Sequence, residues 1–264
     1  MEENEKCTSC GNPYKPYKPY KPYKPYKPYK SCIPSKPEYT KVTFVLPTPP
    51  GVKPLPPYIY FDVDNRLDIE RVQQIIPMLI SFWQQHYEEK ATSGTSECAA
   101  CSDKYAQKEF TPVWIDKEGE YFIDNGRKAL NFLMDTLTDS FRQNGEGKVR
   151  PGKIFYLNPA SNSTMCSNNG DSESCISLDV AINPHALENV LISNLDLVGS
   201  LFHAWTHRMG YRHPVNVYTN YFSAEAAMCL MRGFQDKVPG QPDSVYTQYF
   251  DCTKCNSKYF PPRC

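Results

Sequence analysis

The chain has 264 residues, of which 40% are hydrophobic, and this is enough to bury one sizeable core with appendages. Its 29 basic and 29 acidic residues give a formal net charge of zero, so the charge balance indicates no nucleic-acid partner. No apolar run is long enough to cross a bilayer, and we therefore predict no membrane span.

Eleven cysteines are many for a cytosolic enzyme. Six of them form three C-x-x-C pairs, which are Cys7 with Cys10, Cys98 with Cys101, and Cys252 with Cys255. The count favours disulfides in an exported protein, with Cys166 to Cys175 as one local pair, and a four-cysteine structural zinc site is the alternative. Residues 1–6 lack the features of a signal peptide. We therefore expect secretion or delivery outside the producing cell, after removal of a signal or by a route that reads none.

Residues 1–57 are predicted to form an arm without a core of its own. Residues 13–30 repeat Pro-Tyr-Lys six times, and proline at every third position favours a polyproline II rod. Such a rod suits a stiff spacer, a strip that docks on a surface or delivery partner, or a pro-segment across the active cleft. Residues 34–57 stay proline-rich, with one short strand expected at 42–46.

A folded domain is predicted over residues 58–237, beginning with a strand at 58–63. A helix follows, because apolar residues repeat at steps of three and four at Ile69, Val72, Ile76, Leu79 and Trp83. Pro77 is expected to kink this helix. His86 lies outside the apolar stripe and is expected at the surface, and residues 91–108 are predicted to be a surface loop.

The middle of the chain predicts mixed α and β elements. A hairpin over 112–123 precedes a helix that ends near Gly145 and whose apolar face is Leu130, Leu133, Leu137 and Phe141. Strands are expected at 153–157 and 175–182, separated by a Ser/Asn-rich loop in which Asp171 and Glu173 offer a weak calcium site. Residues 238–264 are expected to form a Cys-rich tail. The predicted fold class is α+β.

Three of the five histidines fall between residues 203 and 213. His203 and His207 stand four residues apart, so on a helix both rings lie on one face and can reach one metal ion. Gly210 is expected to end this helix and turn the chain, which would bring His213 back as a third ligand. Three protein ligands leave a fourth position for water, as in a catalytic zinc site.

These eleven residues resemble the metzincin signature of zinc endopeptidases, H-E-x-x-H-x-x-G-x-x-H, at every fixed position except one. Ala204 stands where the family has a glutamate. In the family this glutamate is the general base toward the zinc-bound water and then the acid toward the leaving amine. An engineered substitution and a natural pseudoenzyme are the two explanations. The resemblance implies a zinc endopeptidase acting on a protein or peptide substrate, inactive or nearly so in this Ala204 form.

The resemblance further implies a zincin-like domain with a mixed sheet, an active-site helix and a small C-terminal subdomain. It places an extended substrate along an edge strand before the active helix, for which Ser177, Leu178 and Asp179 are the candidates. Gluzincin-type peptidases take their third ligand from a glutamate on a later helix, so Glu225 is the alternative to His213.

Two further roles follow from the resemblance. Met228 is the candidate for a methionine-containing turn under the metal. Tyr218 or Tyr221 is the candidate for a phenol that stabilises the oxyanion.

The alternative function is a pseudoprotease that acts as a zinc-dependent protein-binding module.

Overall fold

The computed structural model describes residues 37–115, 122–160, 163–167, 176–214, 217 and 219–250. The chain divides into residues 1–37 and a compact unit that begins at Glu38. The Pro-Tyr-Lys repeats, the calcium candidates Asp171 and Glu173, the oxyanion candidate Tyr218 and the first and last C-x-x-C pairs lie outside the described residues.

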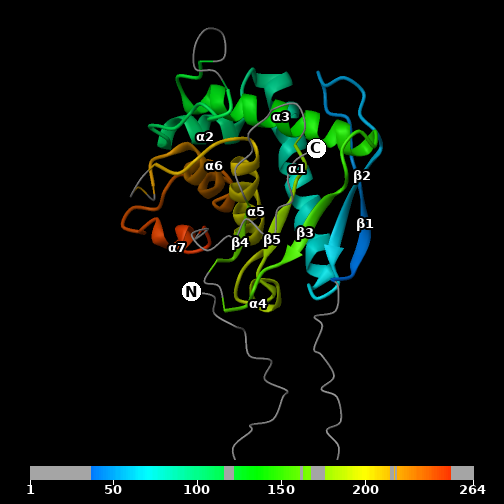
Figure 1. Cartoon of the computed structure of the whole chain (residues 1–264). Helices are drawn as coiled ribbons and strands as arrows, with labels where there is room; N and C mark the ends of the chain where they lie inside the picture. The colour runs from blue at the N-terminus through cyan, green and yellow to red at the C-terminus, as the bar shows by residue number, and fades with distance from the viewer. Residues whose placement is uncertain are drawn as a thin grey trace, which may run out of the picture. The chain divides into compact units, whose positions relative to one another are not determined.

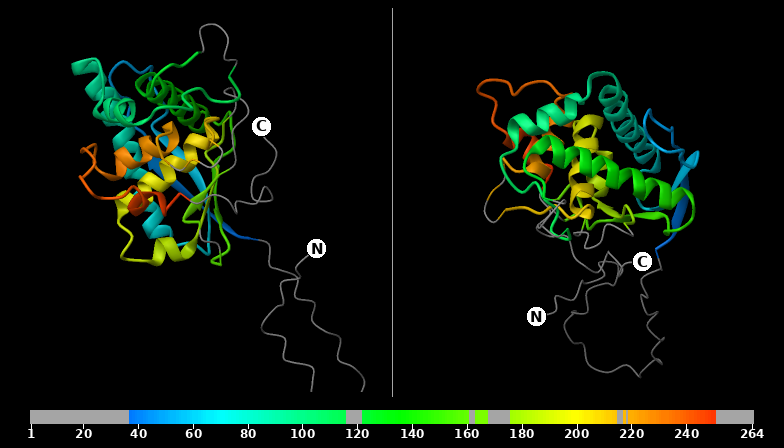
Figure 2. Two further views of the ribbon diagram at one scale, coloured as in Figure 1. Left: turned by 90° about the vertical axis from the view of Figure 1, so that its left-hand side faces the viewer. Right: turned by 90° about the horizontal axis from the view of Figure 1, so that it is seen from above.

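The described part is an α+β fold built on one five-stranded sheet in the order β1-β2-β3-β5-β4. Strands β2, β3 and β5 run parallel, whereas β1 and β4 are antiparallel to their neighbours. The helices gather on one face of this sheet (Figures 1 and 2). In chain order the elements are β1 (Tyr39–Val45), β2 (Tyr58–Asp64), α1 (Ile69–Ser93), α2 (Glu97–Tyr105), α3 (Gly126–Gly145), β3 (Gly152–Tyr156), β4 (Met165–Cys166), β5 (Val180–Ile182), α4 (Pro184–Glu188), α5 (Asn194–Arg208), α6 (Phe222–Met231) and α7 (Ser244–Thr247).

The folded unit extends beyond both expected boundaries. β1 pairs with β2 along its whole length, with Val42 opposite Phe61, and alternate residues of both strands face the core. The sheet therefore begins at Tyr39, before the boundary expected at residue 58. At the other end, Ser200 Oγ of α5 donates to the carbonyl of Tyr249 at 2.9 Å, so residues after 238 also belong to this unit.

The two long helices follow the predicted apolar spacing. α1 is assigned as one helix of 25 residues through Pro77, capped by the Asp68 side chain at its start and by Gly94 at its end. α3 covers the predicted helix, and the two helices are joined by a 2.9 Å hydrogen bond from Trp83 Nε1 to Thr138 Oγ1. The expected hairpin is only partly visible, since residues 116–121 lie outside the described residues, and no strand is assigned to 112–115 or 122–123.

The segment expected as a surface loop contains α2, whose first turn is capped by Ser96. Cys101 of α2 forms a disulfide with Cys229 of α6, whereas Cys98 is a buried free thiol. The described C-x-x-C pair therefore neither closes on itself nor forms a four-cysteine zinc site. Cys166 is also disulfide-bonded, and its expected partner, Cys175, lies outside the described residues.

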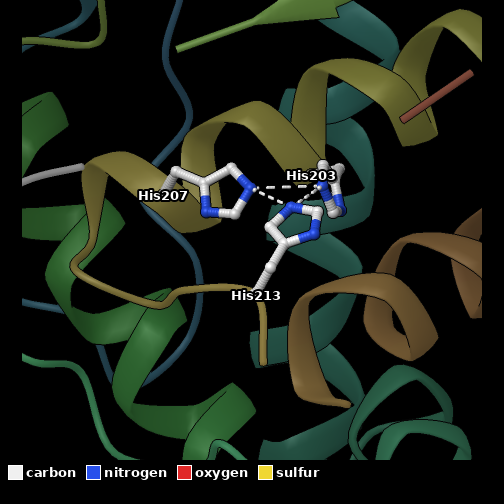
Figure 3. Close-up of side chains that lie close together, drawn as sticks. All are labelled: His203, His207 and His213. Carbon is white, nitrogen blue, oxygen red and sulfur yellow. Dashed lines mark hydrogen bonds between the residues drawn. The ribbon is translucent and has the colours of Figure 1, made fainter. Parts of the chain in front are cut away.

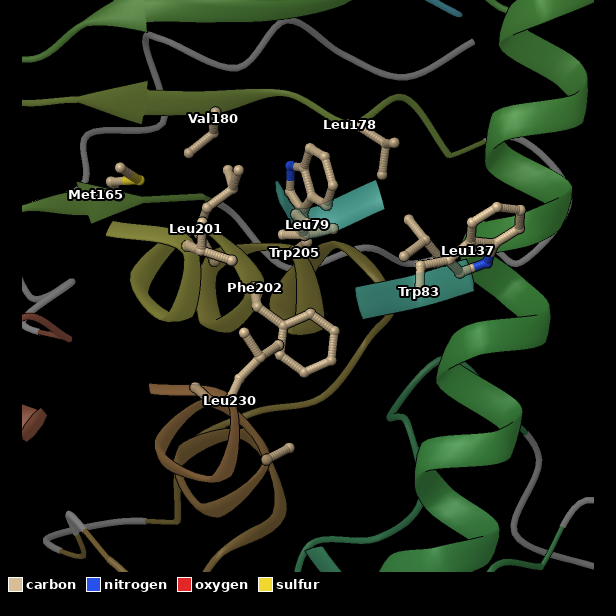
Figure 4. Close-up of a cluster of buried hydrophobic side chains, with 14 of the residues drawn as sticks. Leu79, Trp83, Leu137, Met165, Leu178, Val180, Leu201, Phe202, Trp205 and Leu230 are labelled. Carbon is tan, nitrogen blue, oxygen red and sulfur yellow. The ribbon is translucent and has the colours of Figure 1, made fainter. Parts of the chain in front are cut away.

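α5 runs through the centre of the core. Leu201, Phe202 and Trp205 lie between the strands and α6 (Figure 4). The indole of Trp205 stacks on Phe61 of β2 with ring centroids 6.0 Å apart. Because the helix is buried on almost every side, its position relative to the sheet is fixed by packing. None of the described helices is long and apolar enough to span a membrane.

His86 is buried, contrary to the expected surface position. It is 1% exposed, its Nδ1 lies 2.7 Å from Ser96 Oγ, and its Nε2 has no hydrogen-bond partner among the described residues. Burial lowers the pKa of His86 to about 4, with a smaller contribution from the charge of Lys90. The folded protein therefore holds this imidazole neutral.

The buried His86 is expected to make the protein acid-sensitive. The unfolded chain protonates this imidazole at its ordinary pKa of about 6.5, so stability is present above that pH and is lost as the pH falls toward about 4. We expect a loss on the order of 3 kcal/mol from this group. Urea unfolding at pH 7 and pH 4.5 should show a smaller loss for His86→Asn, whose amide can keep the bond to Ser96. Equal losses in the two proteins would contradict this account.

Candidate metal centre

The helix that carries the first two histidines has well-defined ends. Ser193 and Asp196 form a capping box at the start of α5, each side chain accepting from the other residue's backbone N–H. At the far end, Met209 is the C-cap and Gly210 has a φ of 90°, in the left-handed region. The chain turns there and passes His213 back toward the helix, as the spacing predicted.

The three histidine rings converge through their Nε2 atoms (Figure 3). The Nε2 atoms of His203 and His213 are 3.2 Å apart, those of His203 and His207 are 3.2 Å apart, and those of His207 and His213 are 2.9 Å apart. Three nitrogens held tetrahedrally around zinc, at roughly 2.0–2.1 Å from it, would be separated by about 3.3 Å. The observed triangle therefore fits a small four-coordinate ion with little adjustment.

Each imidazole is oriented by a hydrogen bond at Nδ1, the ring nitrogen that points away from the other two rings. Nδ1 of His203 lies 3.2 Å from the Ser223 carbonyl at the start of α6. Nδ1 of His207 lies 2.8 Å from the Tyr211 carbonyl, just after the glycine turn. Because a carbonyl can only accept, these two rings carry their proton on Nδ1 and leave Nε2 bare. Metal-ligating histidines are oriented in this way by their outer partners.

The third ring, His213, has a hydroxyl as its outer partner. The Tyr221 hydroxyl lies 3.0 Å from Nδ1 of His213. Tyr221 is the N-cap of α6 and is 1% exposed, so its ring is fixed by packing. The expected role of Tyr221 as an oxyanion stabiliser does not match this position, because its hydroxyl is engaged on the side of His213 away from Nε2.

The surroundings of His203 and His207 favour neutral rings. Burial lowers the pKa of His207 to about 4, with a further contribution from His213, and burial lowers the pKa of His203 well below its ordinary value. At neutral pH, the bare Nε2 lone pairs of His203 and His207 therefore face each other 3.2 Å apart without a proton between them. A cation between them would remove this repulsion. His213 is exposed, so the cluster reaches the surface on that side.

Gly210 is required for two reasons, its backbone conformation and its close neighbour. A Cβ on Gly210 would lie 1.8 Å from Nε1 of Trp114, whose ring packs directly against the turn. The Gly210 carbonyl also accepts from the Val113 N–H at 3.0 Å. The segment around Trp114 therefore supports the turn that returns His213 to the cluster.

Gly210→Ala is expected to lower the free energy of unfolding by about 3 kcal/mol, since about 1–2 kcal/mol comes from the left-handed conformation and a similar amount from overpacking. Gly51→Ala is the matched control, because Gly51 also has a positive φ, of 77°, but a Cβ there would have nothing within 4 Å. Denaturant unfolding should show the larger loss for Gly210→Ala. Equal losses would mean that the Trp114 contact is unimportant.

Position 204 carries no group that can exchange a proton. Ala204 follows His203 on α5, is 0% exposed and belongs to the apolar core. No carboxylate of the described residues joins the three histidines to make a larger ligand group. The described site therefore has the geometry for a metal but lacks a general base beside it.

Glu225, the alternative third ligand, is engaged elsewhere. Its Oε1 accepts from the Asn220 N–H at 3.0 Å and from Lys237 Nζ at 3.1 Å, and the carboxylate is 0% exposed. Burial raises the pKa of Glu225, and the bonds to Asn220 and Lys237 oppose this. Its contacts support the loop between His213 and α6, and Glu225 is not part of the group formed by the three histidines.

Met228 does not lie in a turn. It is fully buried in the middle of α6, and this helix packs so closely on α5 that a Cβ on Gly199 would lie 2.3 Å from Met231 Cγ. The methionine-turn expectation is therefore not met by Met228, which is a core residue of a helix.

The expected substrate strand also occupies a different position. Ser177, Leu178 and Asp179 precede β5 and are buried, and β5 itself lies between β3 and β4. The Asp179 carboxylate pairs with Arg150 and accepts from the Lys153 N–H. The edge of the sheet on this side is the antiparallel strand β4.

Sequence reasoning missed several groups that shape the site. The Ser223 and Tyr211 carbonyls are backbone atoms, so no residue type marked them. Phe250, in the expected tail, stacks on His203 with ring centroids 4.4 Å apart and planes inclined by 4°.

Comparisons with protein-family models, curated proteins and solved structures found no match.

Proposed function

We propose that this chain has the scaffold of a zinc-dependent endopeptidase and that its Ala204 form lacks the general base. The observation that carries the proposal is the convergence of three Nε2 atoms whose rings are oriented by hydrogen bonds at Nδ1. Both the spacing of the histidines in the sequence and the geometry of their rings support it. The zincin-like character of the fold is part of the same proposal.

The donor set fits zinc. Imidazole suits zinc, copper, iron and nickel, and three histidines with one open tetrahedral position are typical of catalytic zinc. When bound, zinc would polarise a water molecule and a substrate carbonyl. His203, His207 and His213 would hold it, while Ser223, Tyr211 and Tyr221 keep their rings in place.

Two residues of the site, His213 and Ala204, bear on how a peptide would reach the cluster and on which catalytic group the site lacks. The exposed His213 leaves an approach to the cluster from solvent. Ala204 can neither accept the proton of an attacking water nor deliver one to the leaving amine.

The second candidate is a pseudoprotease that binds a protein partner at the surface around the exposed His213. The complete burial of Ala204 in the apolar core favours it, because a methyl group at this position is well accommodated. The Pro-Tyr-Lys repeat would then serve as a tether or docking strip.

A digest distinguishes the two candidates. Zinc-loaded Ala204→Glu protein is incubated with a mixture of unfolded proteins, and new termini are mapped by mass spectrometry with and without a chelator. Chelator-sensitive cleavage supports the endopeptidase. A folded, zinc-loaded Ala204→Glu protein that produces no new termini would favour the binding module.

A further inference from the structure

A pocket of about 360 Å³ lies beside the disulfide, away from the histidine cluster's own ligands. Its lining includes Glu97, Ala100, Cys101 and Lys104 of α2 and, from the turn after α6, Phe234 and Asp236. Lys104 Nζ donates to Asp236 Oδ1 at 2.6 Å and so connects the two sides. Cys101 is one half of the disulfide with Cys229, so the pocket adjoins a residue that carries this bond.

The guanidinium of Arg232 lies against the same disulfide. Its Nη2 is 3.6 Å from Cys101 Sγ and 3.5 Å from Cys229 Sγ. Arg232 is 9% exposed, and its Nη1 has no hydrogen-bond partner among the described residues. The neighbouring carboxylate of Asp236 is bonded to Lys104 and Tyr105 instead. Arg232 Nε donates to the Gln235 carbonyl at 3.1 Å, the Tyr105 ring lies 5.1 Å from the guanidinium carbon, and Asp236 interacts with the charge through space. The charge beside the two neutral sulfurs is therefore compensated in part, without a carboxylate bonded to it.

This arrangement favours the reduced form of the two cysteines. Disulfide sulfurs are weak acceptors, and an incompletely compensated buried charge is costly. After reduction, a thiolate in direct contact with the guanidinium would be stabilised by it, as reactive cysteines are by a neighbouring arginine. A disulfide whose reduced form is stabilised is easier to reduce.

We propose that Cys101–Cys229 is a thiol–disulfide exchange site, opened through this pocket by a small thiol of the glutathione class, and that opening it weakens metal retention. The thiolate attacks Cys101 Sγ, the Cys101–Cys229 bond breaks, and Cys229 leaves as a thiolate beside Arg232. A second small thiol releases Cys101, and the two small thiols end as their own disulfide. Cys98 is not the attacking group, because burial raises the pKa of its thiol to about 12.

Helix α6 connects the exchange site with the metal centre. It carries Cys229, its Ser223 carbonyl holds the ring of His203, and its N-cap Tyr221 holds the ring of His213. The disulfide fixes α6 to α2, so reduction removes one restraint on the groups that orient two ligands. This second part rests on the proposed metal centre, whereas the exchange itself does not.

The exchange is tested on the folded full chain in glutathione buffers, with free thiols alkylated and mapped by mass spectrometry. Arg232→Met keeps an apolar stem and removes the charge. Half reduction of Cys101–Cys229 should then require a [GSH]²/[GSSG] ratio about tenfold higher, equivalent to about 30 mV. The disulfide of Cys166 is the internal control and should not shift. An unchanged midpoint for Cys101–Cys229 would overturn the role of Arg232 and with it the proposal.

Entry of the small thiol through the pocket is tested with a separate variant. This test keeps the proposal falsifiable even if Arg232→Met does not fold. Ala100→Phe adds a ring at a partly exposed position of α2 that lines the pocket. We expect reduction of Cys101–Cys229 to slow severalfold while its midpoint stays the same. Reduction as fast as in the unmodified chain would overturn entry through the pocket.

Metal retention is measured in the same samples with a chromophoric zinc chelator. The reduced chain and Cys101→Ser/Cys229→Ser should both lose zinc to the chelator more readily than the oxidised chain, and glutathione should not affect the double variant. A double variant that holds zinc as the oxidised chain does would overturn the coupling. If no form holds zinc, the proposed metal centre fails, while the alkylation map still decides the exchange site.

Discussion

Ala204→Glu is expected to raise peptide hydrolysis by the zinc-loaded protein about 10²–10⁴-fold, which is the usual contribution of a positioned general acid–base group. The carboxylate would be carried by the residue next to His203, at the position where the metzincin signature has its glutamate. Initial rates on an unfolded protein substrate, with the zinc content of each sample measured, give the comparison.

The matched control is Ala204→Gln, which has the size of glutamate without its basicity. Both substitutions enlarge a side chain that is 0% exposed, so both should lower stability to a similar degree. Only the glutamate should restore turnover. If the two variants have the same low rate, although both are folded and contain zinc, the general-base account of position 204 is wrong.

Replacing His213 is expected to remove most of the bound zinc. The affinity should fall by more than the roughly 10–100-fold that loss of an outer partner of a ligand costs, because a donor atom is lost. His213 is the best ligand to replace, since it is exposed whereas His203 and His207 are buried. His213→Ala should therefore leave the thermal midpoint of the metal-free protein almost unchanged. Competition with a chromophoric chelator measures the affinity.

Glu225→Gln is the control for this experiment. The glutamine can still accept from the Asn220 N–H, and Lys237 keeps its 2.7 Å bond to Asp243. Zinc should be retained at an affinity close to that of the unmodified chain. Loss of zinc from Glu225→Gln together with retention in His213→Ala would reverse the assignment of the third ligand.

The local part of the site could be predicted from the sequence. Two histidines four apart on an apolar helix, a glycine and a third histidine specify a short-range geometry, and the structure brings these three rings together. Gly210 was predicted for its backbone conformation. Its second role, the contact with Trp114, depends on a segment nearly one hundred residues earlier and left no signal in the motif.

The remaining parts depend on long-range packing. Ser177 to Asp179 read as a continuation of a strand, but the buried Asp179 pairs with Arg150, and β4 occupies the edge of the sheet. Glu225 was a reasonable ligand by its position after the motif, and only the fold shows that Lys237 is its partner. The polar composition of residues 91–108 concealed α2, whose buried face carries Cys98 and Cys101.

The three histidines come from a single stretch of the chain, and this has a consequence for how strongly zinc would protect the fold. Ligands that are close in sequence stay close after unfolding, so the unfolded chain would keep some affinity for zinc. Binding to the unfolded state subtracts from the stabilisation that the native affinity would otherwise give. The rise in melting temperature on zinc addition should therefore be smaller than the native dissociation constant implies, and increasingly so at high zinc concentration.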